Sequence, residues 1–398
     1  MKSILVRCDD TSVGNPQHLI GLLDVAKLAA VHQLAQAGTV RVVTAERGRE
    51  PQMPSVGAGL AAHWGWLGYA IPSAQPEYQA RDLAWAPARA YAATLQLDVA
   101  ESQVAWCCDF VTHHDGRVID PTAGHLPTKE ASPLVDSLNA RLATPRQRWV
   151  AGEGWRHTLL VDAPDWADQL TDLPVDPPER MVGQLWQRHL PRGPLGEWMR
   201  LLIEQAADVL DHHEINRVRV DLGENPANLI WLWGPGTGQA PVPLPTRHGV
   251  SGAMVSSVFP LRGLARLLGV TWSQGVERIE ERPVARLLQD VTRLLKTHDV
   301  VYVPIRIDET DPTARQCAME RLDQGLIKPL AEETTQRGNV RLVVAIDDRP
   351  SGTTPFAAIG PSLATHPAVR LTAQAAMDSS LVFETWEKWR AWWFNDAP

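Results

Sequence analysis

The chain has 398 residues, of which 44% are hydrophobic and 21% charged, and a formal net charge of −8. A chain of this length can bury two cores, so two domains are expected. The acidic balance excludes nucleic acid and anionic membrane surfaces as partners, because both require a basic face. No apolar run reaches the roughly 20 residues of a membrane-spanning helix. Four cysteines without metal or disulfide spacing indicate reduced thiols, and hence a cytoplasmic protein.

Strand-like and helix-like segments alternate along the chain, which indicates an α/β fold. The expected elements are a strand at 4–6, a helix at 18–37, a strand at 40–43, a hairpin at 103–119, a strand at 155–162, a loop-rich stretch at 163–194 and a helix at 195–212. Downstream we expect a strand at 229–233, an apolar segment at 253–259, helices at 261–268 and 284–296, a strand at 300–307, a helix at 314–330, a strand at 341–346 and a helix at 381–394. In the helix at 195–212, the residues expected to face inward are Leu201, Leu202, Ala206 and Val209.

The segment His213–Gly238 contains the most informative pattern. A helix-like stretch leads through a polar turn into the apolar run Leu229–Trp233, and a Gly-Pro-Gly-Thr-Gly loop follows. This order is typical of an α/β sheet with a ligand site at the carboxyl edge of its strands. The glycine-rich loop lacks the Lys-Ser/Thr of a phosphate-binding P-loop, so we interpret it as a turn at the edge of the sheet.

The same segment resembles a signature of the archaeal-type cofactor-independent phosphoglycerate mutases. The matching positions are Asn216, Arg219, Gly223, Pro226, Ala227, Asn228, Trp233, Gly234 and Gly236. Three further stretches are similar to the family, namely Ala26–Gly38, His63–Tyr69 and Trp155–Val161. The resemblance implies an alkaline-phosphatase-like α/β core sheet sandwiched by helices, with an inserted α+β domain. It places the core at 1–96 and 223–398 and the insertion at 97–222.

In the family that this chain resembles, two divalent metals activate a serine that receives the phosphoryl group. Counting back from Tyr69 places that serine at Gly59, which has no nucleophile, and Ser55 could replace it only if the loop slid. The family's Arg-Cys-Asn reads Cys107-Cys108-Asp109 here, so an arginine expected to bind phosphate is missing. The Asp-Pro-His of the inserted domain reads Asp176-Pro177-Pro178.

Acidic residues still follow the core strands, but the histidines that the family places there do not. The acids are Asp9, Asp10, Asp308, Asp347 and Asp348. An all-oxygen set suits a single Mg²⁺. Alternatively, these are solvated strand-end acids paired with Arg306 or Arg349. In either case the two-metal site of Mn²⁺ or Mg²⁺ is predicted to be absent, and Asp9, Asp308 and Asp347 are expected in one cluster.

The resemblance therefore predicts a phosphoglycerate-mutase-like protein that is catalytically degenerate and keeps a binding or assembly role. The alternatives are an active phosphoglycerate mutase, a repurposed metal-dependent phosphoester enzyme, or a structural partner of an active relative. The resemblance implies a small phosphorylated ligand, and the expected ligand-binding residues are Arg219, Asn228, Arg156 and His157.

The C-terminal segment Leu381–Phe394 is rich in tryptophan. On a helix, Val382, Trp386, Trp389 and Trp393 would share one face. This face either packs onto the core of the chain or binds a protein partner or a second copy, since tryptophan is enriched at the centres of interfaces.

Overall fold

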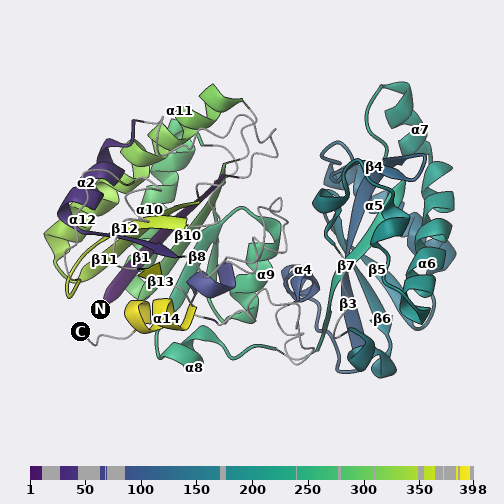
Figure 1. Ribbon diagram of the computed structural model, residues 1–398, viewed down its shortest axis with the longest axis horizontal. Coiled ribbons are helices and arrows are strands. Elements are labelled where there is room, and N and C mark those ends of the chain that lie inside the picture. Colours follow the sequence, from purple (N-terminus) through teal and green to yellow (C-terminus); the bar gives the residue numbers. More distant parts are fainter. Residues whose placement is uncertain are drawn as a thin grey trace.

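The computed structural model describes residues 1–10, 27–43, 63–67, 69, 86–170, 176–238, 240–276, 279–307, 311–347, 354–363, 371, 382–383 and 386–394. These residues form two lobes, each built on its own β-sheet (Figure 1). The α/β class predicted from the sequence is confirmed. No helix among the described residues has the length and apolar character needed to cross a membrane.

The large lobe contains an eight-stranded sheet in the order β13-β2-β12-β11-β1-β10-β8-β9. Its strands are β1 Lys2–Asp10, β2 Thr39–Val43, β8 Gly252–Ser256, β9 Thr271–Gln274, β10 Val300–Ile307, β11 Val340–Asp347, β12 Thr354–Ile359 and β13 Val382–Phe383. The central strand β1 runs parallel to β10 on one side and to β11 on the other. The carboxyl ends of these three strands therefore share one edge of the sheet, where α/β proteins bind their ligands.

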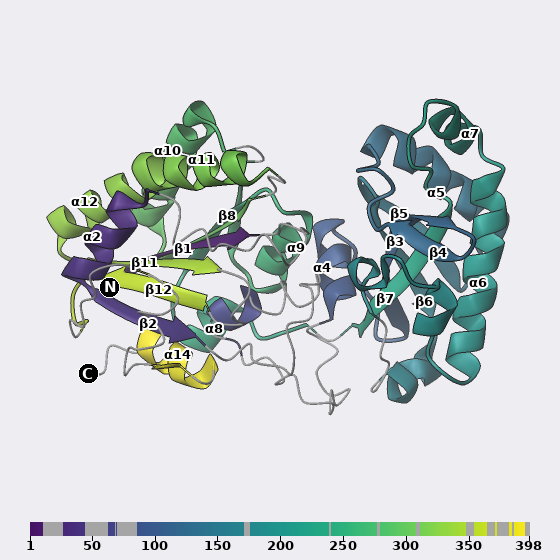
Figure 2. The ribbon, with the colours of Figure 1, turned by 45° about the horizontal axis from the view of Figure 1, so that its top comes forward.

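Helices cover both faces of this sheet (Figure 2). One face is covered by α2 Ala29–Ala37, α10 Glu281–Thr297, α11 Pro312–Leu322 and α12 Lys328–Arg337, and the other by α8 Leu244–His248, α9 Phe259–Leu267 and α14 Trp386–Phe394. Successive side chains of β1 point to opposite faces of the sheet, so Ile4 and Val6 pack in the core on the first face and Leu5 packs in the core on the second. The sandwiched core sheet implied by the resemblance is thus present.

The helix expected at 314–330 is interrupted by a π-helical turn at Asp323–Ile327. Asp323 is fully buried there, and its carboxylate accepts hydrogen bonds from the backbone N–H groups of Ala30 (3.0 Å) and Val31 (2.9 Å). These donors are at the start of α2, whose own N-cap, Leu28, has no side-chain acceptor. Asp323 therefore caps α2 from almost 300 positions away in the sequence. The sequence pattern of the helix that contains Asp323 predicts no interruption there.

The small lobe contains the five-stranded antiparallel sheet of β3 Gln103–His114, β4 Arg117–Asp120, β5 Gln147–Glu153, β6 Arg156–Asp162 and β7 Leu229–Thr237. The hairpin predicted between β3 and β4 is present, and Asp115 and Gly116 both adopt positive φ angles, as a tight hairpin turn requires. Strand β7 pairs with β3. The boundary predicted at residue 222 assigned this strand to the large lobe, but the ladder with β3 places it in the small one.

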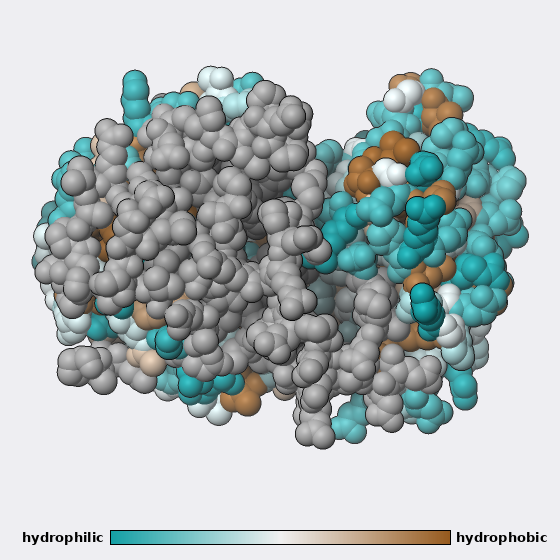
Figure 3. All heavy atoms as spheres, in the orientation of Figure 1, coloured by the Kyte–Doolittle hydropathy of each residue, from teal (hydrophilic) through white to brown (hydrophobic). Residues whose placement is uncertain are grey.

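Among the described residues of the small lobe there are also three helices and three short 3₁₀ segments. They are α5 Thr128–Leu142, α6 Pro194–Asp211, α7 Glu214–Asp221, η3 Pro164–Leu170, η4 Pro178–Met181 and η5 Trp186–His189. On α6, Leu202 and Ala206 are buried as expected, whereas Leu201 is 45% exposed, so its predicted inward orientation is wrong. Figure 3 shows that the visible surface of this lobe is mainly hydrophilic, with apolar side chains scattered over it.

Helix α4 Pro87–Thr94 lies between the two lobes (Figure 2). It packs closely against α9, because a Cβ atom on Gly263 would lie 1.8 Å from the carbonyl oxygen of Ala90. Thr94 Oγ1 donates a hydrogen bond to the carbonyl oxygen of Phe259 at 2.9 Å. The ring of Tyr91 makes edge contacts with Phe259 of α9 and Trp233 of β7. The α4–α9 contact thus joins the lobes and sets their relative position.

The C-terminal helix begins at Trp386, and Val382 lies in strand β13, so the single predicted helix over 381–394 is wrong at its start. Trp389 and Trp393 are buried in the large lobe. The Trp389 indole donates a hydrogen bond to the carbonyl oxygen of Trp66 at 3.1 Å. These two tryptophans belong to the core of the chain itself.

Candidate functional site

The first component of the site is the edge of the large sheet at which its parallel strands end. Strand β1 runs toward the small lobe and ends at this edge (Figure 2). The ladder aligns Asp9 with Arg306 of β10 on one side and with Asp347 of β11 on the other. Asp10 is level with Ile307, the last residue of β10. The backbone therefore puts Asp9, Arg306 and Asp347 in one row across three strands.

The remaining predicted acids, Asp308 and Asp348, lie outside the described residues, as do the side chains of Asp9, Asp10 and Asp347. The predicted cluster of Asp9, Asp308 and Asp347 stays a prediction, which the strand register supports. Gly59 and Ser55 also lie outside the described residues.

The second component comes from the small lobe and is centred on Glu179 of η4. Its Oε2 atom is buried without a hydrogen-bond partner among the described residues. Burial raises the pKa of this carboxyl, while the guanidinium groups of Arg156, Arg306 and Arg180 oppose the rise. Because Arg306 belongs to β10 and Glu179 to the small lobe, the electrostatic interaction crosses from one lobe to the other.

Asp109 of β3 is the third component and is 2% exposed. Burial raises the pKa of Asp109 to about 7, and the nearby charge of Glu179 adds to the rise. Its Oδ2 accepts a hydrogen bond from Trp233 Nε1 at 2.7 Å, while Oδ1 has no hydrogen-bond partner among the residues described. Two positions earlier on the same face of β3, Cys107 is fully buried, and burial raises the pKa of its thiol, which stays protonated.

Arg156 begins β6 and is aligned with Asp109 in the β3–β6 ladder. Its guanidinium lies over the Trp155 ring, 4.0 Å from the ring centroid. In the described part of the chain no hydrogen bond or ion pair occupies its side-chain donors. A guanidinium held by an aromatic face with unused donors is suited to bind an oxyanion. Of the four predicted ligand-binding residues, Arg156 is the one that the structure places at this site.

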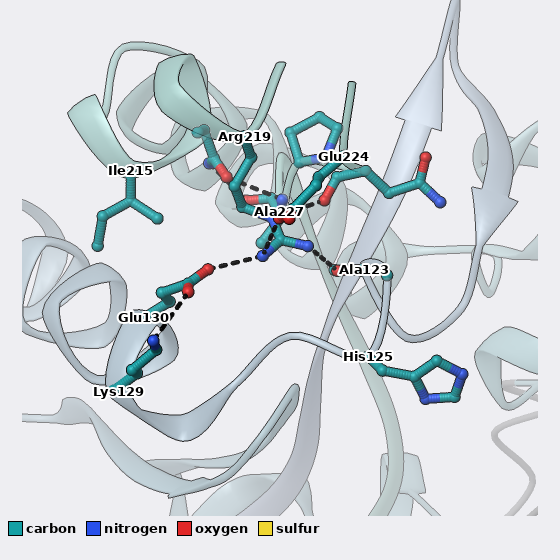
Figure 4. Close-up of polar contacts among 12 residues, drawn as sticks. Ala123, His125, Lys129, Glu130, Ile215, Arg219, Glu224 and Ala227 are labelled. Atoms are coloured by element: carbon teal, nitrogen blue, oxygen red, sulfur yellow. Dashed lines mark hydrogen bonds and ion pairs between the residues drawn. The ribbon is translucent and has the colours of Figure 1, made fainter. Parts of the chain in front are cut away.

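Arg219 has a different role from the one expected (Figure 4). It lies on α7, away from the large lobe (Figure 1), and is 4% exposed. Its guanidinium donates to the carbonyl oxygens of Asn225 (2.8 Å) and Ala123 (3.0 Å) and forms ion pairs with Glu130 (2.6 Å) and Glu224 (3.1 Å). The side chain is thus committed to joining α7, α5 and two turns, and it does not reach the site.

Asn228 and His157 are likewise structural. The Asn228 amide exchanges two hydrogen bonds with the backbone of His113, at 2.9 and 3.1 Å. His157 is fully buried in the small-lobe core, where its Nδ1 accepts from the Gly152 N–H at 3.0 Å and its ring packs on Phe110. Burial lowers the pKa of His157 to about 3, so the ring is neutral and inaccessible to a ligand.

The sequence reasoning missed two site residues, Glu179 and Tyr91. Glu179 directly follows Asp176-Pro177-Pro178, the stretch that departs from the family motif. Its place next to this motif could have identified it as a candidate site residue. Tyr91, from the lobe-joining helix α4, is close enough to Asp109 to lower the pKa of that carboxyl, and no local pattern identifies it.

The sequence model of 2,3-bisphosphoglycerate-independent phosphoglycerate mutase matches residues 88–216. The mutase of Methanosarcina acetivorans is 29% identical over 267 residues, which cover 65% of this chain and 66% of that protein, just under two thirds of its length. Mutase 2 of Methanothermobacter thermautotrophicus is 35% identical over 180 residues, covering 45% of this chain and 43% of that protein.

Two solved structures are similar over nearly the whole chain. The cofactor-independent phosphoglycerate mutase from Thermoplasma acidophilum matches with a TM-score of 0.55 and 21% identity, covering 96% of this chain and 97% of that chain. The PH0037 protein from Pyrococcus horikoshii matches with a TM-score of 0.68 and 17% identity, covering 100% and 98%. The chain is therefore similar in sequence to the 2,3-bisphosphoglycerate-independent phosphoglycerate mutases over about two thirds of its length, and it shares their fold.

The chain differs from the mutase motifs that it resembles on the face of the small lobe that carries Cys107 and Asp109. A buried thiol, Cys107, occupies the position that the resemblance assigns to an arginine. A buried acid, Asp109, follows two residues later, and Pro178 stands where a histidine is expected. This part of the site is therefore less basic than the family motifs imply.

Proposed function

We propose that this phosphoglycerate-mutase-like protein of the cytoplasm has lost phosphoryl transfer and binds a small phosphorylated ligand between its lobes. The observation that carries the loss of activity is Gly59, the position that the family motif assigns to the nucleophile. Glycine has no side chain that could form a phosphoenzyme intermediate. Ligand binding is supported by Arg156, whose guanidinium is fixed over Trp155 beside the lobe junction.

The proposal extends to the metals. A two-metal phosphoryl-transfer centre holds its ions about 3.5–4 Å apart and requires several ligands. Here the candidate donors are acids alone, and Arg306, a fixed positive charge, is aligned with Asp9 in the same row. Neutral imidazoles normally complete sites for transition metals, and none follows these strands. This set does not fit the two-metal centre of the family, so no step of the proposed function passes through one.

Two measurements on the purified protein test the proposal. Conversion of 3-phosphoglycerate to 2-phosphoglycerate, assayed with added Mn²⁺ or Mg²⁺, should not exceed the blank, and turnover by the native chain would refute the loss of activity. Gly59→Ser should also stay inactive, because a serine without its metals remains a protonated, weak nucleophile.

Calorimetric titration with 3-phosphoglycerate addresses binding. Arg156→Gln should weaken binding about tenfold or more, as expected for loss of a charge-assisted contact. Arg148→Gln, an exposed arginine on neighbouring β5, is the matched control and should bind like the native chain. Equal affinities of the Arg156 variant and the native chain would remove Arg156 from the site.

A further inference from the structure

Arg156 has an acidic neighbour on each side in the sheet of the small lobe. In the β-ladders it is aligned with Asp109 of β3 and with Glu153 of β5. Directly opposed residues of neighbouring antiparallel strands have Cβ atoms about 5 Å apart, so both carboxylates are within reach of the long arginine side chain. Among the described residues, however, neither acid forms an ion pair with Arg156, whose guanidinium lies over the Trp155 ring instead, 4.0 Å from its centroid.

Each of the two acids is held by another partner. Asp109 Oδ2 accepts a hydrogen bond from Trp233 Nε1 at 2.7 Å. Glu153 Oε1 pairs with Nη2 of Arg262 at 2.7 Å, and these side chains are 51% and 36% exposed, so water screens their charges. Asp109 is 2% exposed and lacks this screening. Asp109, once ionised, is therefore the stronger competitor for the guanidinium of Arg156.

Trp233 pulls Asp109 toward the side of β3 that is opposite to Arg156. Strand β3 pairs with β6, which carries Arg156, on one side and with β7, which carries Trp233, on the other. The indole is 2% exposed, and its ring makes an edge contact with Tyr91 of α4, with the centroids 6.1 Å apart. Packing between β7 and α4 thus fixes the direction of the indole N–H, and the hydrogen bond opposes rotation of the carboxyl group toward β6.

Ionisation of Asp109 changes the balance between its two neighbours. Burial raises the pKa of Asp109 to about 7, the charge of Glu179 on η4 adds to the rise, and Arg156 opposes it. The other titratable groups that face this carboxyl are Cys107 and Tyr91, and burial raises the pKa of both, so they stay neutral. Below about pH 7 the acid is mostly neutral, whereas above it the carboxylate attracts the guanidinium.

We propose that the hydrogen bond from Trp233 holds the Asp109 carboxyl group on the β7 side of β3 and thereby keeps the Arg156 guanidinium free to bind an anion. Trp233 and Asp109 are positioning residues, because they act through Arg156 without touching the ligand. The inference rests on the proposed function, in which Arg156 binds the phosphorylated ligand. It deepens that function by naming the groups that control this binding.

The first test is calorimetric titration with inorganic sulfate between about pH 6 and 8.5, a range over which sulfate keeps its charge. The native chain should bind sulfate about tenfold more weakly at the alkaline end, because the anion and the Asp109 carboxylate compete for one guanidinium. Asp109→Asn still accepts from the indole but cannot ionise, so its affinity should be the same at both ends. The ring of His125 packs against Trp155, with the centroids 5.4 Å apart, and its titration would also weaken binding at alkaline pH. A fall in affinity that persists in Asp109→Asn would therefore overturn the inference.

The second test removes the indole donor. Trp233→Phe should bind sulfate about tenfold more weakly than the native chain at the alkaline end, and adding Asp109→Asn to this variant should restore the affinity. Trp231→Phe is the matched control, since Trp231 is also buried in β7 but donates to the carbonyl oxygen of Asp176 at 2.7 Å. This control should keep the pH dependence of the native chain. Equal affinities of folded Trp233→Phe and Trp231→Phe would contradict the inference.

A crystal structure of ligand-free Trp233→Phe, grown at the alkaline end of this range, separates the inference from the proposed function. The Arg156 guanidinium should leave Trp155 and pair with Asp109, and a guanidinium that remains over Trp155 would refute the inference. If the native chain binds neither sulfate nor 3-phosphoglycerate at any pH, the proposed function fails, and the crystal structure still decides whether Trp233 controls the position of Arg156.

Discussion

Replacement of Arg219 by methionine tests whether this arginine of the family signature stabilises the fold or binds a ligand. Methionine keeps the apolar stem and removes the guanidinium. The carbonyl oxygens of Ala123 and Asn225 then lose charged donors, at about 1–3 kcal/mol each for buried acceptors. Glu130 also loses its partner, but its side chain is 28% exposed, so water offsets part of that loss.

The sum is a destabilisation of about 3–5 kcal/mol, the range measured when one partner of a buried ion pair is removed. Arg217→Met is the matched control, because Arg217 is an exposed arginine on the same helix, and its unfolding free energy should be nearly unchanged. Because two lobes need not unfold together, urea unfolding followed by tryptophan fluorescence should be combined with hydrogen exchange of peptides from α5 and α7.

The structural role predicts faster exchange in α7 of Arg219→Met, with the affinity for 3-phosphoglycerate unchanged in the absence of urea. If this variant is as stable as Arg217→Met, or if it retains its stability and loses ligand affinity, the reasoning from the contacts of Arg219 is wrong.

Three other predictions follow from the packing. Because burial raises the pKa of Asp109 to about 7, the folded chain keeps a proton that the unfolded chain releases, so the free energy of unfolding should fall as the pH rises from about 4 to 7. Asp109→Asn should flatten this part of a plot of unfolding free energy against pH, and an unchanged slope would contradict the prediction. Gly263→Ala should lower the melting temperature and increase proteolysis between the lobes, because its Cβ would meet the backbone of α4 at 1.8 Å; native-like melting would show that the helices separate freely. Truncation after Ser380 removes the buried Trp389 and Trp393, so the chain should aggregate or unfold; a folded product with an altered oligomeric state, seen by light scattering, would instead support an interface.

The alternation of elements and the turn at Asp115-Gly116 could be predicted because they depend on neighbouring residues. Hydrophobic periodicity reports which face of a strand or helix is buried, and a tight turn requires residues that tolerate positive φ. The interruption of the helix at Asp323 could not be predicted, since its cause is the start of α2, far away in the sequence. The assignment of β7 to the small lobe depended in the same way on its ladder with β3.

For the site, the sequence by itself determined the resemblance to the mutases, the glycine at the position that this resemblance assigns to the nucleophile, Gly59, and the acids that follow the core strands. Each of these is a matter of residue identity at a counted position. Only the tertiary structure decided which polar residues meet. It placed Arg219, Asn228 and His157 in structural contacts and aligned Arg156 with the buried Asp109 in the sheet of the small lobe. The physical reason is that a motif specifies residue types along the chain, whereas burial and charge pairing depend on which strands and helices the fold makes neighbours.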